Sequence, residues 1–320
     1  MNPPKRSLAD IVRLMAPVRD VKEDSDPAKE FVETVFAYLE SPKVVDERSI
    51  HRAPGLHASS LTSTCGRREI LTTIALVTSG AKVVVERAPH TAGNTLTQDG
   101  GHMIHSWWQD HYLGPAGMLI GQWQCPRCAA KTGETAFRPK GCECGHKGTF
   151  HYQELPVHIR ELGISGHSDG VVTNTPWSHE AKHRVFELKT KNYKSWLETK
   201  TPERAHVIQV HCYMKGLDLD EAIIVYVARG KECSWKVRDG QFIAGKPHVK
   251  SFLVPFDDDL WSEMTEIVTN YHEACARISK VVEDAEPLTT LDPADFPRVC
   301  DSATCSMAKK CAVSDLCFSV

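Results

Sequence analysis

The chain has 320 residues and a formal net charge of −3. This length allows one large domain with a small insertion, and a charge so close to neutral does not by itself indicate a nucleic-acid-binding protein. No stretch reaches the roughly 18 apolar residues that a membrane-spanning helix needs, and the first residues lack the apolar core of a signal peptide. We therefore expect a cytoplasmic protein without a membrane partner.

The first third of the chain is predicted to be mainly helical. Residues 1–54 are expected to form a helical region, because Asp26-Pro27 can begin a helix and apolar side chains follow it at helical spacing. A helix over about 60–79 would carry Cys65 near its start. A strand over about 82–87 and a helix over about 100–112, which carries Gly101 and His105, would follow it.

Twelve cysteines are many for this length, and clustered cysteines in a cytoplasmic protein indicate metal binding rather than disulfides. One group lies after the predicted His105 helix: Cys125, Cys128, Cys142 and Cys144. Four thiolates make a closed tetrahedral zinc site, so we expect a zinc-ribbon insertion over residues 122–150. The second pair has one intervening residue instead of two, and His146 could replace Cys142 or Cys144. The alternative is a loop of reduced thiols without metal.

The next segment carries carboxylates on short apolar runs. Strands are predicted near residues 153–161, 163–172 and 185–190, where β-branched side chains are frequent. Asp169 lies on the second of these strands. In Glu187-Leu188-Lys189 the period of two places Glu187 and Lys189 on one face. Two carboxylates suit a hard divalent cation such as magnesium or manganese; the alternative is a surface ion pair between Glu187 and Lys189.

A helix is predicted after these strands, beginning at Thr201-Pro202 and ending at Gly216. Gln209 and Tyr213 lie one turn apart on it and share a face; they could instead belong to an ordinary amphipathic helix. Further strands are expected at 222–228 and 251–255, then a long helix at 259–283 and a linker at 284–297. The stretch 182–204 is basic on balance and contains Tyr193 and Trp196, which could stack on unpaired bases.

Together, Gly101-x3-His105, Asp169, Glu187-x-Lys189 and Gln209-x3-Tyr213 resemble the motifs of the PD-(D/E)XK nuclease superfamily, and within it the RecB-like and CRISPR-associated RecB-like exonucleases. The resemblance implies an α/β fold of the restriction-endonuclease type, with a mixed central sheet flanked by helices, over residues 55–320.

It also implies roles for the residues of the motifs. His105, Asp169, Glu187 and the carbonyl of Leu188 would bind magnesium or manganese. Lys189 would orient or activate the attacking water, and Gln209 and Tyr213 would position DNA or Lys189. Glu154, on the preceding strand, could join the site.

A second group of cysteines lies in the tail at residues 298–320. Cys65 with Cys300, Cys305 and Cys311 resembles the iron–sulfur staple of the same exonucleases, which implies a 4Fe–4S cluster. The gap between Cys300 and Cys305 is longer than in those exonucleases, so Cys317 could substitute, and zinc is the rival metal. Isolated cysteines in apolar surroundings are expected in the core: Cys212, Cys233 and Cys275.

The function that the resemblance implies is metal-dependent hydrolysis of DNA by an exonuclease acting on single strands or free ends. Recombination or CRISPR-adaptation proteins would be compatible partners. The alternatives are a restriction-type endonuclease and a non-catalytic nucleic-acid-binding protein that uses the zinc ribbon. An iron–sulfur redox enzyme is disfavoured because no Gly-rich dinucleotide motif follows a strand. Digestion polarity, strand preference, oligomeric state and pathway stay open.

Overall fold

The computed structural model describes residues 32–33, 37, 56–79, 92–133, 135, 138–173, 182–229, 236–238, 241–243, 248–284, 286–287, 290–305, 308–311 and 313–319. The predicted strand at 82–87, almost all of the predicted region 1–54, and Cys233 lie outside these residues. Within them, no helix is both long and apolar enough to cross a bilayer.

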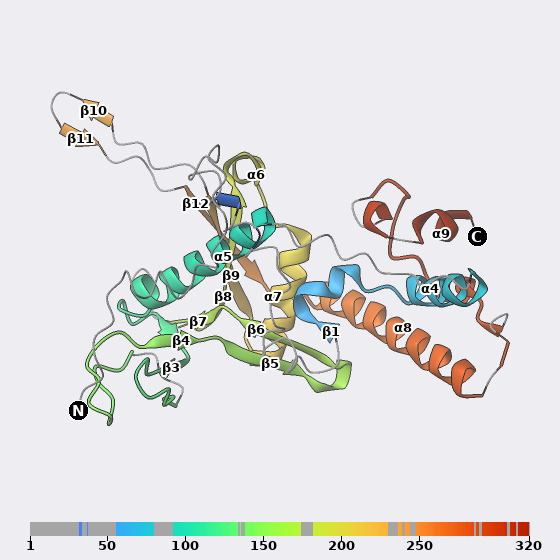
Figure 1. The fold of residues 1–320 in the computed structure, drawn as a ribbon, viewed down its shortest axis with the longest axis horizontal. Helices are drawn as coiled ribbons and strands as arrows, with labels where there is room; N and C mark the ends of the chain where they lie inside the picture. Colours follow the sequence, from blue (N-terminus) through green and yellow to red (C-terminus); the bar gives the residue numbers. More distant parts are fainter. Residues whose placement is uncertain are drawn as a thin grey trace, which may run out of the picture.

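The largest sheet among the described residues has five strands in the order β12-β9-β8-β7-β2. Their bounds are β2 Leu119–Ile120, β7 Gly170–Val172, β8 Arg184–Asn192, β9 Glu221–Arg229 and β12 Val249–Pro255. Strands β8 and β9 are parallel and the other neighbours are antiparallel. The expected mixed sheet flanked by helices is therefore confirmed (Figure 1).

A second sheet has three strands in the order β1-β6-β5. It contains β1 Leu56–His57, β5 Leu155–Ile159 and β6 Ile164–Ser168. Only Asp169 separates β6 from β7, so the chain passes from one sheet to the other at that residue. Strands are therefore confirmed within both predicted ranges, 153–161 and 163–172, but each range is divided between two sheets instead of forming one continuous strand.

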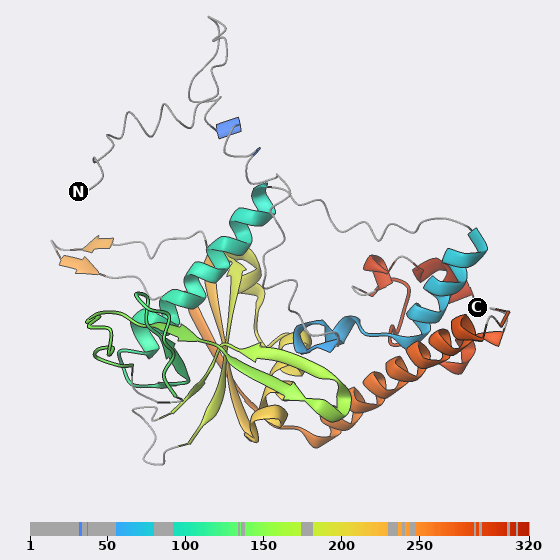
Figure 2. The same ribbon diagram turned by 60° about the horizontal axis from the view of Figure 1, so that its bottom comes forward.

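The helices pack on both sides of these sheets. Their bounds are α4 Gly66–Ser79, α5 Ala92–Trp107, α6 Tyr193–Glu198, α7 Arg204–Leu217, α8 Asp258–Glu283 and α9 Ser314–Ser319. Short turns of other helix types are η1 Ala58–Ser63, η3 Arg160–Leu162, η5 Pro293–Asp295 and η6 Ala308–Lys310, and η2 Trp108–Leu113 is a π-helix that continues α5. Helix α5 packs on one side of β8 and α7 on the other, and Figure 2 shows the packed pair α4–α8 extending away from the strands.

Two hairpins extend from the sheets. Strands β3 Gln122–Gln124 and β4 His151–Gln153 pair at the base of the four-cysteine segment, and β10 Lys236–Arg238 pairs with β11 Gln241–Ile243 in an arm between β9 and β12 (Figure 1).

The period of two along β8 divides the core. Val185 belongs to the apolar cluster that packs against α7, whereas Phe186 and Leu188 belong to a second cluster with Trp123 and Phe150 of the four-cysteine segment. All of these side chains are buried. The side of β8 that carries Glu187 and Lys189 is therefore the α7 side.

Helix α7 differs from its prediction at both ends. It begins at Arg204, with Glu203 rather than Thr201 at the N-cap, and it continues through Gly216 to a left-handed Asp218. The Glu203 N–H donates to the Tyr226 hydroxyl at 3.0 Å, which fixes the start of the helix from outside its sequence. Gly216 is needed for packing instead of capping, because a Cβ there would lie 2.3 Å from Val157 Cγ1.

Gly166 offers a test of this packing. A Cβ at Gly166 would lie 2.8 Å from Tyr213 Cε1, so Gly166→Ala should destabilise the fold by about 1–3 kcal/mol through overpacking. The control is Gly100→Ala on α5, where a Cβ meets nothing within 4 Å and helix propensity should add up to about 1 kcal/mol. Urea unfolding measures both, and equal midpoints for the two variants would contradict the packing.

Candidate active site

Asp169 lies at the centre of a polar cluster where β6 gives way to β7. Its Oδ2 accepts a hydrogen bond of 2.7 Å from the Leu188 N–H, and its carbonyl accepts one of 2.8 Å from Gln109 Nε2. Its Oδ1 lies 3.2 Å from His105 Nδ1. Burial alone would lower the pKa of His105, but the hydrogen bond to Asp169 and the Asp169 charge outweigh it, and the pKa is raised.

The buried Glu187 and the half-buried Lys189 form an ion pair on the α7 side of β8. Lys189 Nζ lies 2.6 Å from Glu187 Oε1 and donates to Gln209 Oε1 at 2.9 Å. Gln209 Nε2 in turn donates to the Tyr213 hydroxyl at 2.8 Å. The structure thus joins Glu187, Lys189, Gln209 and Tyr213 in one chain of contacts.

One carboxylate oxygen of Glu187 takes no part in the ion pair with Lys189. Glu187 is only 2% exposed, and its Oε2 is buried without a hydrogen-bond partner among the described residues. Burial, and then the negative charge of Asp169, raise the pKa of Glu187 well above its usual range, although Lys189 opposes this. A buried carboxylate oxygen without a partner is costly, and a cation beside it would supply the missing interaction.

Glu154 joins the cluster from the opposite strand. The antiparallel register pairs Leu155 with Ser168, so Glu154 lies across from Asp169. The ligand atoms of His105, Glu154 and Asp169 all lie within 4.8 Å of one another. Loss of water around the Glu154 carboxylate, followed by the Asp169 charge, raises its pKa to about 7, although the residue as a whole is exposed.

The donors of this cluster fit a hard divalent cation. They are carboxylate oxygens and one imidazole nitrogen, a set suited to magnesium or, with the imidazole, manganese. The orphaned Glu187 oxygen is consistent with the same ion. Of the sequence-predicted ligands, His105 and Asp169 lie in contact and their charges act on Glu187, while Leu188 provides its N–H to Asp169.

Two residues on the π-helix also support the cluster and were not predicted from the sequence. Gln109 donates a hydrogen bond to the Asp169 carbonyl. The Asp110 carboxylate accepts one of 2.8 Å from the Tyr152 N–H, and the Asp110 backbone carbonyl accepts one of 2.6 Å from Arg138. Both are buried. The π-helix inserts a residue into the helical register, and such bulges are frequent at functional sites. In the sequence, the one feature that marks these two residues is that Gln109 and Asp110 are adjacent and flanked by aromatic residues.

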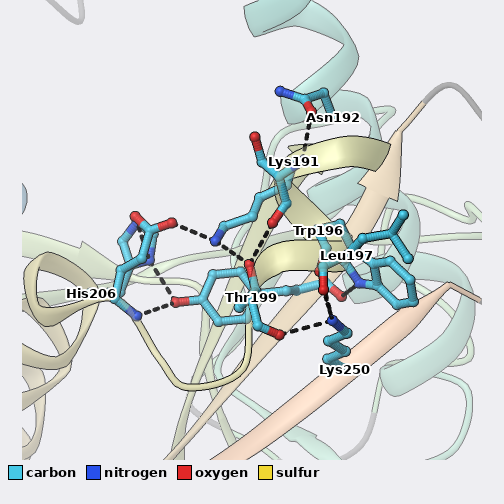
Figure 3. A network of polar contacts seen from close by, with 10 residues as sticks. Lys191, Asn192, Trp196, Leu197, Thr199, His206 and Lys250 are labelled. Atoms are coloured by element: carbon cyan, nitrogen blue, oxygen red, sulfur yellow. Dashed lines mark hydrogen bonds and ion pairs between the residues drawn. The ribbon is translucent and has the colours of Figure 1, made fainter.

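The basic stretch at residues 182–204, which includes β8, has a structural role at two positions (Figure 3). Lys191 pairs with Glu203 and donates to Thr199 Oγ1 at 2.6 Å. Trp196 is 9% exposed and donates to the Tyr226 carbonyl, and Lys250 lies 4.4 Å from its ring centroid. The hypothesis that Trp196 stacks on bases is therefore wrong, because its ring is enclosed.

The four cysteines of the β3–β4 segment converge. Cys125 and Cys144 have sulfurs 3.7 Å apart, Cys128 and Cys142 3.5 Å, and all four lie within 4.8 Å of one another. Tetrahedral zinc with bonds of about 2.3 Å requires sulfurs about 3.8 Å apart. Gly145, at φ +82°, allows the short second pair to turn. His146 is not part of this group of four.

The cysteines of the tail are arranged differently. Residues from α4, the tail and α9 line a cavity of about 130 Å³, and among them are Cys65, Cys300, Cys311 and Cys317. Cys305 lies beside Cys300, whose pKa is raised to about 12, first by burial and then by Cys305. Within the described residues, no three of these sulfurs lie within 4.8 Å of one another, so they are more widely spaced than the four cysteines of the β3–β4 segment. Cys212 is fully buried and Cys275 is half-buried.

Comparison with known proteins identifies no family. No family model matches the chain, and no curated protein matches it. Among solved structures, an alkaline exonuclease from Laribacter hongkongensis is similar at 15% identity and a TM-score of 0.42, covering 75% of this chain and 97% of that one. A phage-related exonuclease from Haemophilus somnus 129PT is similar at 12% identity and a TM-score of 0.36, covering 74% and 100%. TM-scores below 0.5 do not assign the chain to a family.

The four-cysteine site predicts a metal content. The purified chain should hold one zinc ion there, and Cys128→Ser should lose that ion and lower the melting temperature, because Cys125 and its neighbours belong to the core that contains Leu188. Cys275→Ser, outside the site, is the control. Elemental analysis and thermal melting measure both. Unchanged zinc in Cys128→Ser would contradict the assignment.

Proposed function

We propose that this chain is a metal-dependent deoxyribonuclease, an exonuclease that hydrolyses phosphodiester bonds at single-stranded or free DNA ends in recombination, repair or CRISPR-type DNA processing. The observation that carries the proposal is the pairing of Glu187 with Lys189 close enough to Asp169 for its charge to act on Glu187, with a buried Glu187 oxygen that has no partner among the described residues. Two carboxylates and an ammonium group at one point suit phosphodiester hydrolysis.

Each residue of the proposed active site has its own role. Asp169 and Glu187, with His105 and the Leu188 carbonyl, would hold the magnesium or manganese ion, which when bound supplies Lewis-acid polarisation of the phosphate. Lys189 is held between Glu187 and Gln209, so its ammonium group is fixed in place to orient the attacking water. Tyr213 fixes Gln209 through the hydrogen bond from Gln209 Nε2.

The proposal predicts which variants lose cleavage. Asp169→Asn and Glu187→Gln should each lower the rate by about 10³-fold, because a neutral amide no longer binds the cation. The Asp169→Asn chain should stay folded, because the oxygen of the new amide group can still accept from the Leu188 N–H. Cleavage of end-labelled single-stranded, double-stranded and circular DNA, with and without manganese, measures the effect.

Asp258→Asn, in the exposed first turn of α8, is the matched control and should cleave like the wild type. Full activity in either active-site variant would contradict the assignment. Cleavage of circular DNA would show an endonuclease instead, and DNA binding by a wild type that does not cleave would show a non-catalytic binding protein.

We further propose that Cys65, Cys300, Cys305 and Cys311 hold a 4Fe–4S cluster that joins the tail to the start of α4. Support comes from the cavity that Cys65, Cys300 and Cys311 line, from Cys305 beside Cys300, and from the packing of α4 against η5 and α9. Arg67 also donates to the Phe296 carbonyl at 3.5 Å. Metal closure of such a long loop restricts the unfolded chain.

The proposed cluster predicts different effects for two cysteine variants. Cys311→Ser should bleach a brown protein that absorbs near about 400 nm and should cost several kcal/mol of stability, on the order expected for reopening a long closed loop. Cys317→Ser should be nearly neutral. Iron content and melting temperature of each variant show which cysteines bind the cluster. If Cys317→Ser bleaches the protein and Cys300→Ser does not, the tail ligands are Cys305, Cys311 and Cys317.

A further inference from the structure

Three imidazoles lie on the solvent-facing side of the β1-β6-β5 sheet, and the proposed function gives them no role. They belong to His57 on β1, His158 on β5 and His167 on β6. We propose that these three side chains bind one zinc ion above Ser165, at a site separate from the active-site cluster and from both cysteine groups. The proposal does not rest on the proposed function.

The strand register brings the three histidines to one side of the sheet. Strand β1 pairs with one edge of β6 so that His57 lies opposite Ser165, and β5 pairs with the other edge so that His158 lies opposite the same Ser165. His167 is two residues further along β6, so its side chain emerges on the same face as that of Ser165. The three imidazoles thus surround one small side chain.

The burial pattern shows that this face is the exposed one. The residues on either side of His158 along β5 are buried, whereas His158 and His167 are exposed and His57 is half-buried. Gly166 faces the other way, towards α7, because a Cβ there would lie 2.8 Å from Tyr213 Cε1. The imidazoles therefore point away from the core that packs against α7.

The spacing of the three positions suits one ion. Neighbouring strands lie about 4.8 Å apart, so the Cβ atoms of His57 and His158 are about 10 Å apart, and that of His167 lies diagonally about 7–8 Å from each. With a Zn–N bond of about 2.0–2.1 Å, an imidazole that binds through Nε2 holds the ion about 5–6 Å from its own Cβ. Three such imidazoles can meet above Ser165, whose small side chain leaves that space open.

Binding requires the rings to turn but not the sheet to move. The ring nitrogens of these three described residues are not all within 4.8 Å of one another. The rings are nevertheless neighbours, because partial loss of water and then the charges of His158 and His57 lower the pKa of His167. Rotation between staggered rotamers, which exposed side chains make in picoseconds to nanoseconds, is sufficient to bring the nitrogens together.

The chemistry of the ligands selects the ion. Imidazole nitrogens suit zinc, copper and nickel, whereas the carboxylate oxygens of the active-site cluster suit harder ions such as magnesium. Three imidazoles leave the fourth position of a tetrahedral zinc ion open to solvent, unlike the closed site that four thiolates make. A chelator should therefore remove this zinc ion more readily than the zinc ion of the four-cysteine site.

The test is a zinc titration followed by calorimetry, in excess magnesium, on the full chain with its cysteine sites loaded. The variants are His158→Ala, which removes one ligand, and Ser165→Ile, which keeps all three imidazoles but fills the space between them with a side chain that strands accept. His183→Ala is the matched control, because His183 is also exposed but precedes β8. His105→Ala reports any zinc in the active-site cluster. Melting temperatures without zinc verify folding.

The expected result is one zinc ion in the wild type, in His183→Ala and in His105→Ala, beyond the ions of the cysteine sites. The affinity for that ion should be at least about tenfold weaker in His158→Ala and in Ser165→Ile. In nitrogen-15 spectra of the imidazoles, the signals of His57, His158 and His167 should shift together as zinc is added.

Three results would overturn the proposal. They are the absence of an additional zinc ion in the wild type, wild-type affinity in a folded His158→Ala or Ser165→Ile chain, and loss of the additional ion in His105→Ala. The last result would place the zinc in the active-site cluster instead.

Discussion

The change of sheet at Asp169 is the constraint on which the rest of the site depends. A strand that leaves one sheet for another leaves buried backbone groups unpaired at the crossing, and each unpaired group would cost about 1–3 kcal/mol. Here the Asp169 carboxylate accepts from the Leu188 N–H, and Gln109 donates to the Asp169 carbonyl. The same hydrogen bonds that satisfy the backbone groups at the crossing hold the Asp169 carboxylate beside Glu187. The contacts that stabilise the fold therefore also position the groups that the proposed chemistry needs.

The four-cysteine segment is part of this arrangement rather than an appendage. Cys125 lies in the apolar cluster that also contains Trp123, Phe186 and Leu188. The base of the segment is fixed to the π-helix by Asp110 and Tyr152, and Glu154 follows it by one residue. An ion held by the cysteines would thus stabilise the elements that present Gln109 and Glu154 to the cluster.

The sequence predicted what depends on local period and spacing. The period of two was sufficient to place Glu187 and Lys189 on one face, and α8 begins within one residue of its predicted start because Asp257 caps it. The sequence did not predict what depends on contacts between distant elements. The π-helix, the split of each strand between two sheets and the start of α7 are set by Asp169, Asp110 and Tyr226, whose partners lie far along the chain.

The central claim, that Asp169 and Glu187 together hold a divalent cation, is tested most directly by anomalous diffraction from crystals soaked in manganese. The account predicts a manganese peak in contact with both Asp169 and Glu187. Manganese peaks only at surface carboxylates, with Glu187 Oε2 still without a partner, would contradict it.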